Sequence, residues 1–446
     1  MPQNADDTRA IEKSAIRKVC CRIVPFLALM SFINFFDRIA ISFAAPNGMM
    51  KSLGLSAAQY GLAAGIFFVG YIVLGMPSNL ALRRFGARRW LSRIMILWGI
   101  ISLLFTWVSS IHEVYGLRFL LGMAEAGFFP GTILYITTWT PAAYRPKILT
   151  LFYLGLPLSA SIGAPIASLL IQAHGLFGLD GWRLMFMGVS IPAILVGIIT
   201  WFYLPDGPHD ARFLSEPERD WLIRALSREE RVRATTFSAR DIMGTLTNGR
   251  VWQLAVIYFG IVYGLYALGF FLPTIVKGFE SKFNMKFNVM QQGLIVAIPF
   301  LVAAICMYFW SDNANRRGVR FWHIGLPVLL GAISVPVALY MPTPTTTIVI
   351  VTITAACIFS AQPSFWAFSS RFLSGSGAAI GIALMNSVGN IGGVLAPYIT
   401  GWVRDYTGLY RAPLFIVGGF MLLSALLTIS VSRGVAQPAP TTSEND

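Results

Sequence analysis

Residues 23–45 read IVPFLALMSFINFFDRIAISFAA, an apolar run long enough for a helix to cross a bilayer. A hydrocarbon core of roughly 30 Å requires about 20 helical residues. Two ionisable residues, Asp37 and Arg38, nevertheless lie inside this run. A charge near the bilayer centre costs roughly 2.5–3.5 kcal/mol, so it is seldom kept there without a use. The stretch therefore predicts a membrane-spanning helix that carries functional charge.

Similar runs recur along the whole chain. Of its 446 residues, 56% are hydrophobic and only 12% are charged. No run alternates with a period of two, as a strand of a membrane barrel would, so each span is expected to be a helix. The sequence thus predicts an all-α integral membrane protein with twelve transmembrane helices. They are expected at residues 23–45, 58–82, 91–110, 114–138, 148–172, 184–204, 251–276, 291–310, 321–341, 346–370, 378–402 and 412–432.

Several common chemistries leave no signature in the sequence. The four cysteines match neither a metal-ligand spacing nor a disulfide framework. No G-x-x-x-x-G-K-[ST] loop is present, so direct use of ATP is not expected. We therefore expect no metal, no cofactor and no enzymatic site. The first twenty residues are polar, and a cleavable signal peptide is not expected either.

The net charge of +14 follows membrane topology rather than a nucleic-acid surface. With both termini cytoplasmic, 25 of the 34 Lys and Arg residues fall in cytoplasmic segments and 7 in segments on the other side. The remaining two, Arg38 and Arg118, are intramembrane. The positive-inside rule then predicts a multi-pass protein of the cytoplasmic (inner) membrane with both termini inside.

The longest polar stretch, about 205–250, divides the spans into six plus six. Its part from Ser215 to Arg233 begins Ser-Glu-Pro-Glu, which is compatible with a capped amphipathic helix, whereas a plain linker of mixed charge is the alternative. We expect three parts: an N-terminal six-helix bundle (1–204), a cytoplasmic linker (205–250), and a C-terminal six-helix bundle with a short tail (251–446).

The two halves share short motifs at one offset of 232 residues. Residues 86–90 (GARRW) and 318–322 (GVRFW) both have G-x-R-x-W, and Ala164-Pro165 maps onto Ala396-Pro397. Duplicated six-helix halves are a common plan of transporters, in which the substrate site lies near the midplane between the halves.

Four ionisable residues lie inside spans of the first half: Asp37, Arg38, Arg118 and Glu125. Arg118 and Glu125 are two helical turns apart, so they share a face about 10 Å apart along the axis, with Gly122 between them leaving room for a ligand or another helix. Two fixed cations suit an anionic cargo, and two carboxylates suit a coupled proton. A carboxylate that loses its arginine to the substrate takes up a proton more readily. The alternative is that these residues are internal ion pairs that only lock span one to span four.

The second half is expected to supply neutral contacts, because the cores of spans seven to twelve contain no Asp, Glu, Lys or Arg. The candidate substrate contacts are Tyr258, Trp366, Asn386 and Asn390, with Tyr71 from span two. Packing is the alternative for the two aromatic residues of the second half, and interhelical hydrogen bonding for the two asparagines. Tyr263 and Tyr266 are expected to pack.

The chain resembles a major facilitator superfamily transporter over essentially its whole length. Residues 83–89 (RRFGARR) occupy the family's loop 2–3 signature, Ser311-Asp312 with Arg316-Arg317 its loop 8–9 counterpart, and Arg118-x-x-x-Gly122 resembles its RxxxG motif. Arg83 stands at the acidic position of the first loop, which removes a usual gating ion pair. The resemblance implies that the gating-loop residues are Arg84, Gly86, Arg88, Asp312 and Arg316.

Within the superfamily the chain is most similar to the anion:cation symporter branch. The residues that carry this likeness are 36–39 (FDRI), 77–79 (PSN), 118–130 (RFLLGMAEAGFFP) and 386–393 (NSVGNIGG). Members of the branch import carboxylates such as sugar acids, tartrate, phthalate and hydroxyphenylacetate, generally with protons. The resemblance implies proton coupling at Asp37 and Glu125 and anion binding at Arg38 and Arg118.

Together these patterns predict a proton-coupled symporter that imports a small organic anion by alternating access. We expect it to work as a monomer in the lipid bilayer without a nucleic-acid partner. An anion exchanger or facilitative uniporter, with structural acids, is the first alternative. A non-transporting membrane sensor or enzyme is the second. The tyrosines and Trp366 would suit an aromatic acid, whereas the asparagines would suit a sugar acid.

Overall fold

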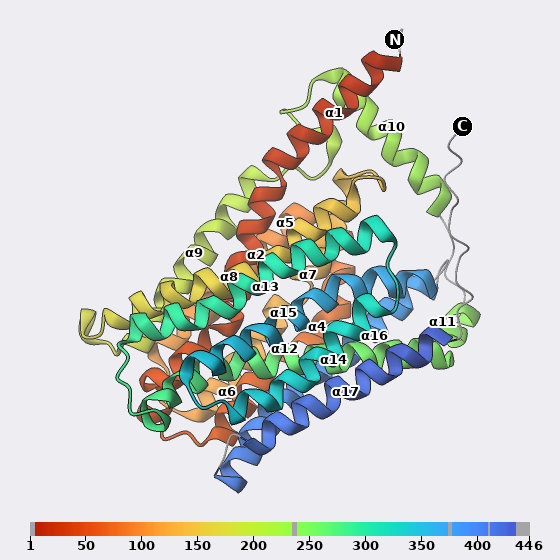
Figure 1. Ribbon diagram of the computed structural model, residues 1–446. Coiled ribbons are helices and arrows are strands. Elements are labelled where there is room, and N and C mark those ends of the chain that lie inside the picture. The colour runs from red at the N-terminus through yellow and green to blue at the C-terminus, as the bar shows by residue number, and fades with distance from the viewer. Residues whose placement is uncertain (1–4, 234–238, 373–376, 409–410, 434–446) are drawn as a thin grey trace.

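The computed structural model describes residues 5–233, 239–372, 377–408 and 411–433, and every regular element in these ranges is a helix (Figure 1). Twelve segments are long and apolar enough to cross a membrane, which confirms the predicted all-α membrane fold. The helices are α1 (Ala5–Arg22), α2 (Val24–Ala44), α3 (Met50–Ser52), α4 (Ala57–Phe85), α5 (Ala87–Leu104), α6 (Ile111–Glu125), α7 (Phe128–Trp139), α8 (Arg145–Gln172), α9 (Gly181–Tyr203), α10 (Glu216–Arg233), α11 (Ala239–Leu246), α12 (Gly249–Lys282), α13 (Val289–Arg317), α14 (Trp322–Val337), α15 (Pro344–Ser369), α16 (Gly377–Thr407) and α17 (Arg411–Arg433).

The predicted fourth span is not one continuous helix. It forms α6 and α7, and the chain bends between them at Ala126 and Gly127. Gly127 has φ +92°, a backbone conformation that residues with a Cβ rarely adopt. The break matters because it makes Glu125 the last residue of α6, where a helix dipole disfavours a negative charge.

Because the number of spans is even, the first and last spans begin and end at one end of the bundle, here called the terminal end. The opposite end is the far end. At the far end α4 packs against α16, and α8 packs against α13, so the two halves meet there across both pairs. Tyr60 Oη donates a hydrogen bond to the Phe270 carbonyl at 2.7 Å, and Asp405 accepts hydrogen bonds from the Ala57 and Ala58 amides at 3.1 and 2.7 Å. The far end is therefore closed.

The internal repeat reappears in the geometry of this closure. Ser56 caps α4 through a capping box with Gln59, and Asn288 caps α13 through a capping box with Gln291, which is the same offset of 232 residues. Gly61 and Gly293 are also related by this offset. A Cβ on Gly61 would collide with the Pro397 carbonyl of α16, and one on Gly293 would lie 2.8 Å from the Ala164 carbonyl of α8. Both glycines permit the close helix crossings that seal the far end.

The polar stretch 205–250 contains the helix that its sequence suggested. Residues 216–233 form α10, and the Ser215 amide donates to Glu218 Oε2 at 2.8 Å. α10 lies beside α1 at the terminal end (Figure 1). Glu218 joins the two helices, because it accepts hydrogen bonds from Ser14 Oγ at 2.6 Å and from Lys18 Nζ at 2.7 Å.

The contact between α1 and α10 is expected to survive mild acid. Burial raises the pKa of Glu218, but the hydrogen bonds from Lys18, Ser14 and Ser215 outweigh it and lower the pKa from 4.5 to about 2. Since the folded-state pKa is depressed, the stabilisation is present above about pH 4.5 and is lost as the pH falls toward about 2. The protection of the α1 amides from hydrogen exchange, relative to the unfolded chain at the same pH, should change little between pH 7 and 5, whereas Glu218→Gln should reduce it at both. Equal exchange in the variant and the parent would contradict this role, and Glu216→Gln is the control from the same turn.

Candidate functional site

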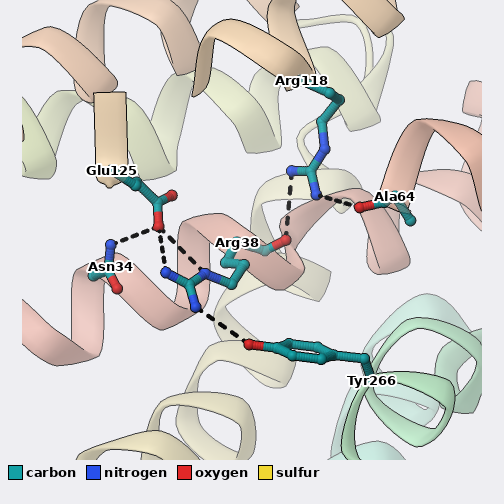
Figure 2. A network of polar contacts seen from close by, with 6 residues as sticks. All are labelled: Asn34, Arg38, Ala64, Arg118, Glu125 and Tyr266. Carbon is teal, nitrogen blue, oxygen red and sulfur yellow. Dashed lines mark hydrogen bonds and ion pairs between the residues drawn. The ribbon is translucent and has the colours of Figure 1, made fainter. Parts of the chain in front are cut away.

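The centre of the first half holds a buried ion pair between α2 and α6. Arg38 Nη2 and Nε donate to Glu125 Oε2 at 2.8 and 3.3 Å, and Asn34 Nδ2 donates to the same oxygen at 2.8 Å (Figure 2). Asn34 lies four residues before Arg38, so both side chains project from one face of α2. Glu125 is fully buried and Arg38 is 8% exposed. The ion pair offsets the desolvation cost of an ionised carboxylate in an apolar interior.

Arg38 also reaches across to the second half of the molecule. Its Nη1 donates to the hydroxyl of Tyr266 on α12 at 3.3 Å (Figure 2). Its guanidinium carbon lies 5.0 Å from the centre of the Phe67 ring and 5.2 Å from that of Tyr71, both on α4. Tyr266 packs against Phe68 and Phe270, as expected, and it also accepts this hydrogen bond. Its hydroxyl belongs to the contacts of the buried arginine.

Asp37 faces a different neighbour although it is adjacent in sequence to Arg38. The Ser102 hydroxyl of α5 donates to Asp37 Oδ1, and Asp37 is 1% exposed. A step of about 100° around the helix separates the two side chains, which explains why one meets α5 and the other α6. Among the described residues, neither Asp37 Oδ2 nor Glu125 Oε1 has a hydrogen-bond partner. Each carboxyl group thus keeps one buried oxygen that can accept a proton.

Arg118 donates hydrogen bonds to backbone carbonyls, although its charge suggests a carboxylate partner. Its Nε donates to the Ala63 carbonyl at 3.2 Å. Its Nη1 and Nη2 donate to the Arg38 and Ala64 carbonyls at 3.5 and 3.4 Å (Figure 2). It is 1% exposed and lies over the Phe67 ring at 4.9 Å. A Cβ on Gly122, one turn along α6, would collide with the Phe67 carbonyl, so the room beside it is filled by α4 rather than by a ligand. The anion-binding role of Arg118 stays a prediction, and its contacts are those of a residue that joins α6 to α4 and α2.

Substitution of Arg118 separates these two roles. Arg118→Met keeps most of the volume but leaves three carbonyls without this donor, each costing on the order of 1 kcal/mol. We expect a lower thermal melting temperature in detergent with little change in the ligand affinity of the folded fraction. A selective loss of affinity at unchanged melting temperature would instead assign Arg118 to anion binding. Arg183→Met, at a partly exposed arginine of α9, is the matched control.

Two of the predicted neutral contacts, Tyr258 and Trp366, form an aromatic wall with Phe365 on the second half. The Tyr258 ring lies 4.8 Å from the Trp366 ring and 4.9 Å from the Phe365 ring. Tyr258 also interacts electrostatically with Tyr71, Tyr153 and Tyr266, so phenols of both halves lie near it. Asn390 donates to the Asn386 carbonyl at 2.9 Å, which is a contact within α16. Asn386 is partly exposed.

The predicted gating residues lie at the terminal end. Gly86, at φ +84°, separates α4 from α5, and Arg88 Nη2 lies 3.0 Å from Asp206 Oδ2 in the segment after α9. The loop signature at residues 83–89 has Arg83 in place of an acid, and Asp206, which follows α9, is the acidic partner of Arg88. Arg84 is exposed and lies over the Phe85 ring at 5.8 Å, and Asp312 pairs with Arg316 within α13 at 2.8 Å. Their role in gating stays a prediction.

Comparison with known proteins agrees with this architecture. The family model of the Major Facilitator Superfamily matches residues 27–397. The chain belongs to the major facilitator superfamily. This transporter is 41% identical to a putative tartrate transporter of Agrobacterium vitis over 98% of this chain and 96% of the relative. It is 38% identical to the putative metabolite transport protein NicT of Pseudomonas putida over 94% of each chain.

The fold is also that of solved members of the superfamily. A bacterial homologue of the human lysosomal transporter Spinster matches with a TM-score of 0.73 and 20% identity, over 92% of this chain and 96% of that one. The chain is therefore a multi-pass transporter and not an enzyme.

Proposed function

We propose that this transporter is a symporter that moves a small organic anion together with protons. The observation that carries the proposal is the buried Arg38–Glu125 pair, which contacts Tyr266 of the other half. A substrate carboxylate is a better partner for a guanidinium fork than a phenol is, since it accepts two parallel hydrogen bonds. An anion that takes Arg38 displaces Glu125, and the displaced carboxylate then gains by binding a proton.

The charges of the cluster support coupling of this kind. Asp37, Arg38, Arg118 and Glu125 are all buried and sum to zero when all four are ionised. A bound monoanion leaves the cluster with one uncompensated negative charge, and one proton restores neutrality. A dianion requires two protons, and two carboxyl groups are present to take them. Neutrality matters because a net charge must otherwise cross the low-dielectric closed state.

The substrate class is proposed from the aromatic residues of the candidate site. The tyrosines and Trp366 offer flat apolar surface with hydroxyl groups, so a small hydroxylated or aromatic carboxylate fits the chemistry. The relatives named tartrate transporters are compatible with this class. A thermal-shift screen of carboxylates, followed by counterflow of the hit in proteoliposomes, tests the proposal. If none of the carboxylates that stabilise the protein shows counterflow, the proposal of organic-anion transport is wrong.

An exchanger or a uniporter with the same arginine is the second candidate, because the Arg38–Glu125 pair could also be only structural. An exchanger requires an anion on the opposite side of the membrane and ignores an imposed pH gradient. Uptake into vesicles that contain no anion therefore separates the two candidates.

We further propose that both termini are cytoplasmic in the inner membrane and that the two bundles, 1–204 and 251–446, rock about the site. The distribution of Lys and Arg supports this orientation, and the closed far end then faces away from the cytoplasm. Cys21 is a free, exposed thiol next to the first span. A membrane-impermeant maleimide should label Cys21 in inside-out vesicles. Labelling of Cys21 in intact cells would show that the orientation is the opposite one.

A further inference from the structure

A charged cavity of about 780 Å³ lies at the terminal end of the first half, and none of its lining residues belongs to the buried Arg38–Glu125 cluster. Its walls come from the end of α1, the start of α5, the segment that follows α9, and α10. The charged residues that line it are Arg22, Arg88, Arg212, Arg219, Asp206 and Asp210.

The cavity has more positive charge than its own carboxylates neutralise. Arg88 is paired with Asp206 at 3.0 Å. Within the described residues, Arg22, Arg212 and Arg219 have no carboxylate within 4.0 Å, so three unpaired guanidinium groups stand against the single carboxylate of Asp210.

One of these arginines is held in place by the backbone. Arg219 Nη2 donates to the Ala211 and Leu214 carbonyls at 2.9 and 3.4 Å, while its buried Nε has no partner among the described residues. A buried N–H donor without a partner can donate to a bound acceptor such as a phosphate oxygen.

The cavity lies at the end of the sixth span. Phe202 and Tyr203, which also line it, are the last residues of the sixth span, and Phe202 is 80% exposed. Aromatic residues at the ends of spans mark the membrane–water interface. The Arg22 guanidinium lies 5.2 Å from the Tyr203 ring and 5.6 Å from the Phe213 ring. The arginines are therefore placed just outside the hydrocarbon layer.

We propose that this cavity binds the phosphate headgroup of an anionic phospholipid, with the acyl chains leaving along α9 past Phe202. Guanidinium groups bind phosphate through parallel hydrogen bonds, and basic pockets at a membrane interface select anionic headgroups. A free phosphate ion would bind the same arginines but would make no apolar contact with the exposed Phe202 ring. A bound lipid would join α1, the linker segment and α10 to the first bundle.

Native mass spectrometry of the full chain with equal amounts of phosphatidylglycerol and phosphatidylcholine tests the proposal. The parent protein should retain phosphatidylglycerol in preference. Arg22→Ala and Arg212→Ala, both at exposed side chains, should each reduce this retention about fivefold. Arg224→Ala is the control, because Arg224 is an exposed arginine of α10 that does not line the cavity. Equal retention by the double variant Arg22→Ala/Arg212→Ala and by the control would overturn the proposal.

Two further measurements on the parent protein keep the proposal testable if the variants fold poorly. A photoactivatable phosphatidylglycerol should label residues 202–219, and unlabelled phosphatidylglycerol but not phosphatidylcholine should compete. Labelling confined to other segments would contradict the site. Millimolar inorganic phosphate should leave the bound lipid in place, and its complete displacement by phosphate would assign the cavity to a free anion instead.

Discussion

Arg38→Ala is expected to abolish substrate binding. The substitution removes the one buried guanidinium of the cluster that reaches both halves of the transporter. Truncation of a buried, hydrogen-bonded charge costs about 2–5 kcal/mol, so the dissociation constant should rise at least about thirtyfold. Isothermal titration with the carboxylate identified by screening measures this change. Arg38→Lys, which keeps the charge but loses the planar fork, should fall between the parent and the alanine variant.

A control is needed because Arg38→Ala also leaves Glu125 buried without its cation. An orphaned buried charge destabilises a protein by about 3–5 kcal/mol. The double variant Arg38→Ala/Glu125→Gln removes both charges, so it should regain thermal stability without regaining affinity. Binding by a stable double variant at the parent's affinity would show that Arg38 is not the anion contact.

Asp37→Asn and Glu125→Gln are expected to uncouple transport from the proton gradient. Each keeps the shape of the side chain but removes the group that is proposed to accept a proton. Both variants should lose uphill accumulation, so that the internal concentration only reaches the external one, while counterflow continues. Parallel uptake and counterflow assays in proteoliposomes measure the two activities.

The matched control is Glu280→Gln, at a carboxylate of α12 that pairs with Lys277 outside the cluster. It should accumulate substrate as the parent does. Full proton-driven accumulation by both Asp37→Asn and Glu125→Gln would contradict the coupling role, and loss of counterflow in both would point to a structural one.

The membrane fold and the identities of the buried charges could be predicted from the sequence. Long apolar runs report burial in lipid directly, and a charge inside such a run is conspicuous because it is costly there. The spacing of Asn34 and Arg38, one helical turn apart, could also have pointed to Asn34 as a partner of the site.

The pairing of those charges could not be predicted. Which side of α2 faces α5 and which faces α6 depends on helix rotation, so Ser102 was not predictable as the partner of Asp37. Tyr266 contacts Arg38 only because α12 of the other half packs against α2. Arg118 shows the same limit, because its backbone partners on α4 and α2 carry no sequence signature.

The central claim is that anion and proton are carried together, and uphill uptake tests it most directly. Proteoliposomes that contain no anion inside should accumulate the carboxylate above its external concentration when the outside is made acidic. A protonophore should abolish the accumulation, and an internal pH dye should report proton entry with the substrate. Equal uptake with and without the pH gradient, or uptake only when an anion is present inside, would contradict the account.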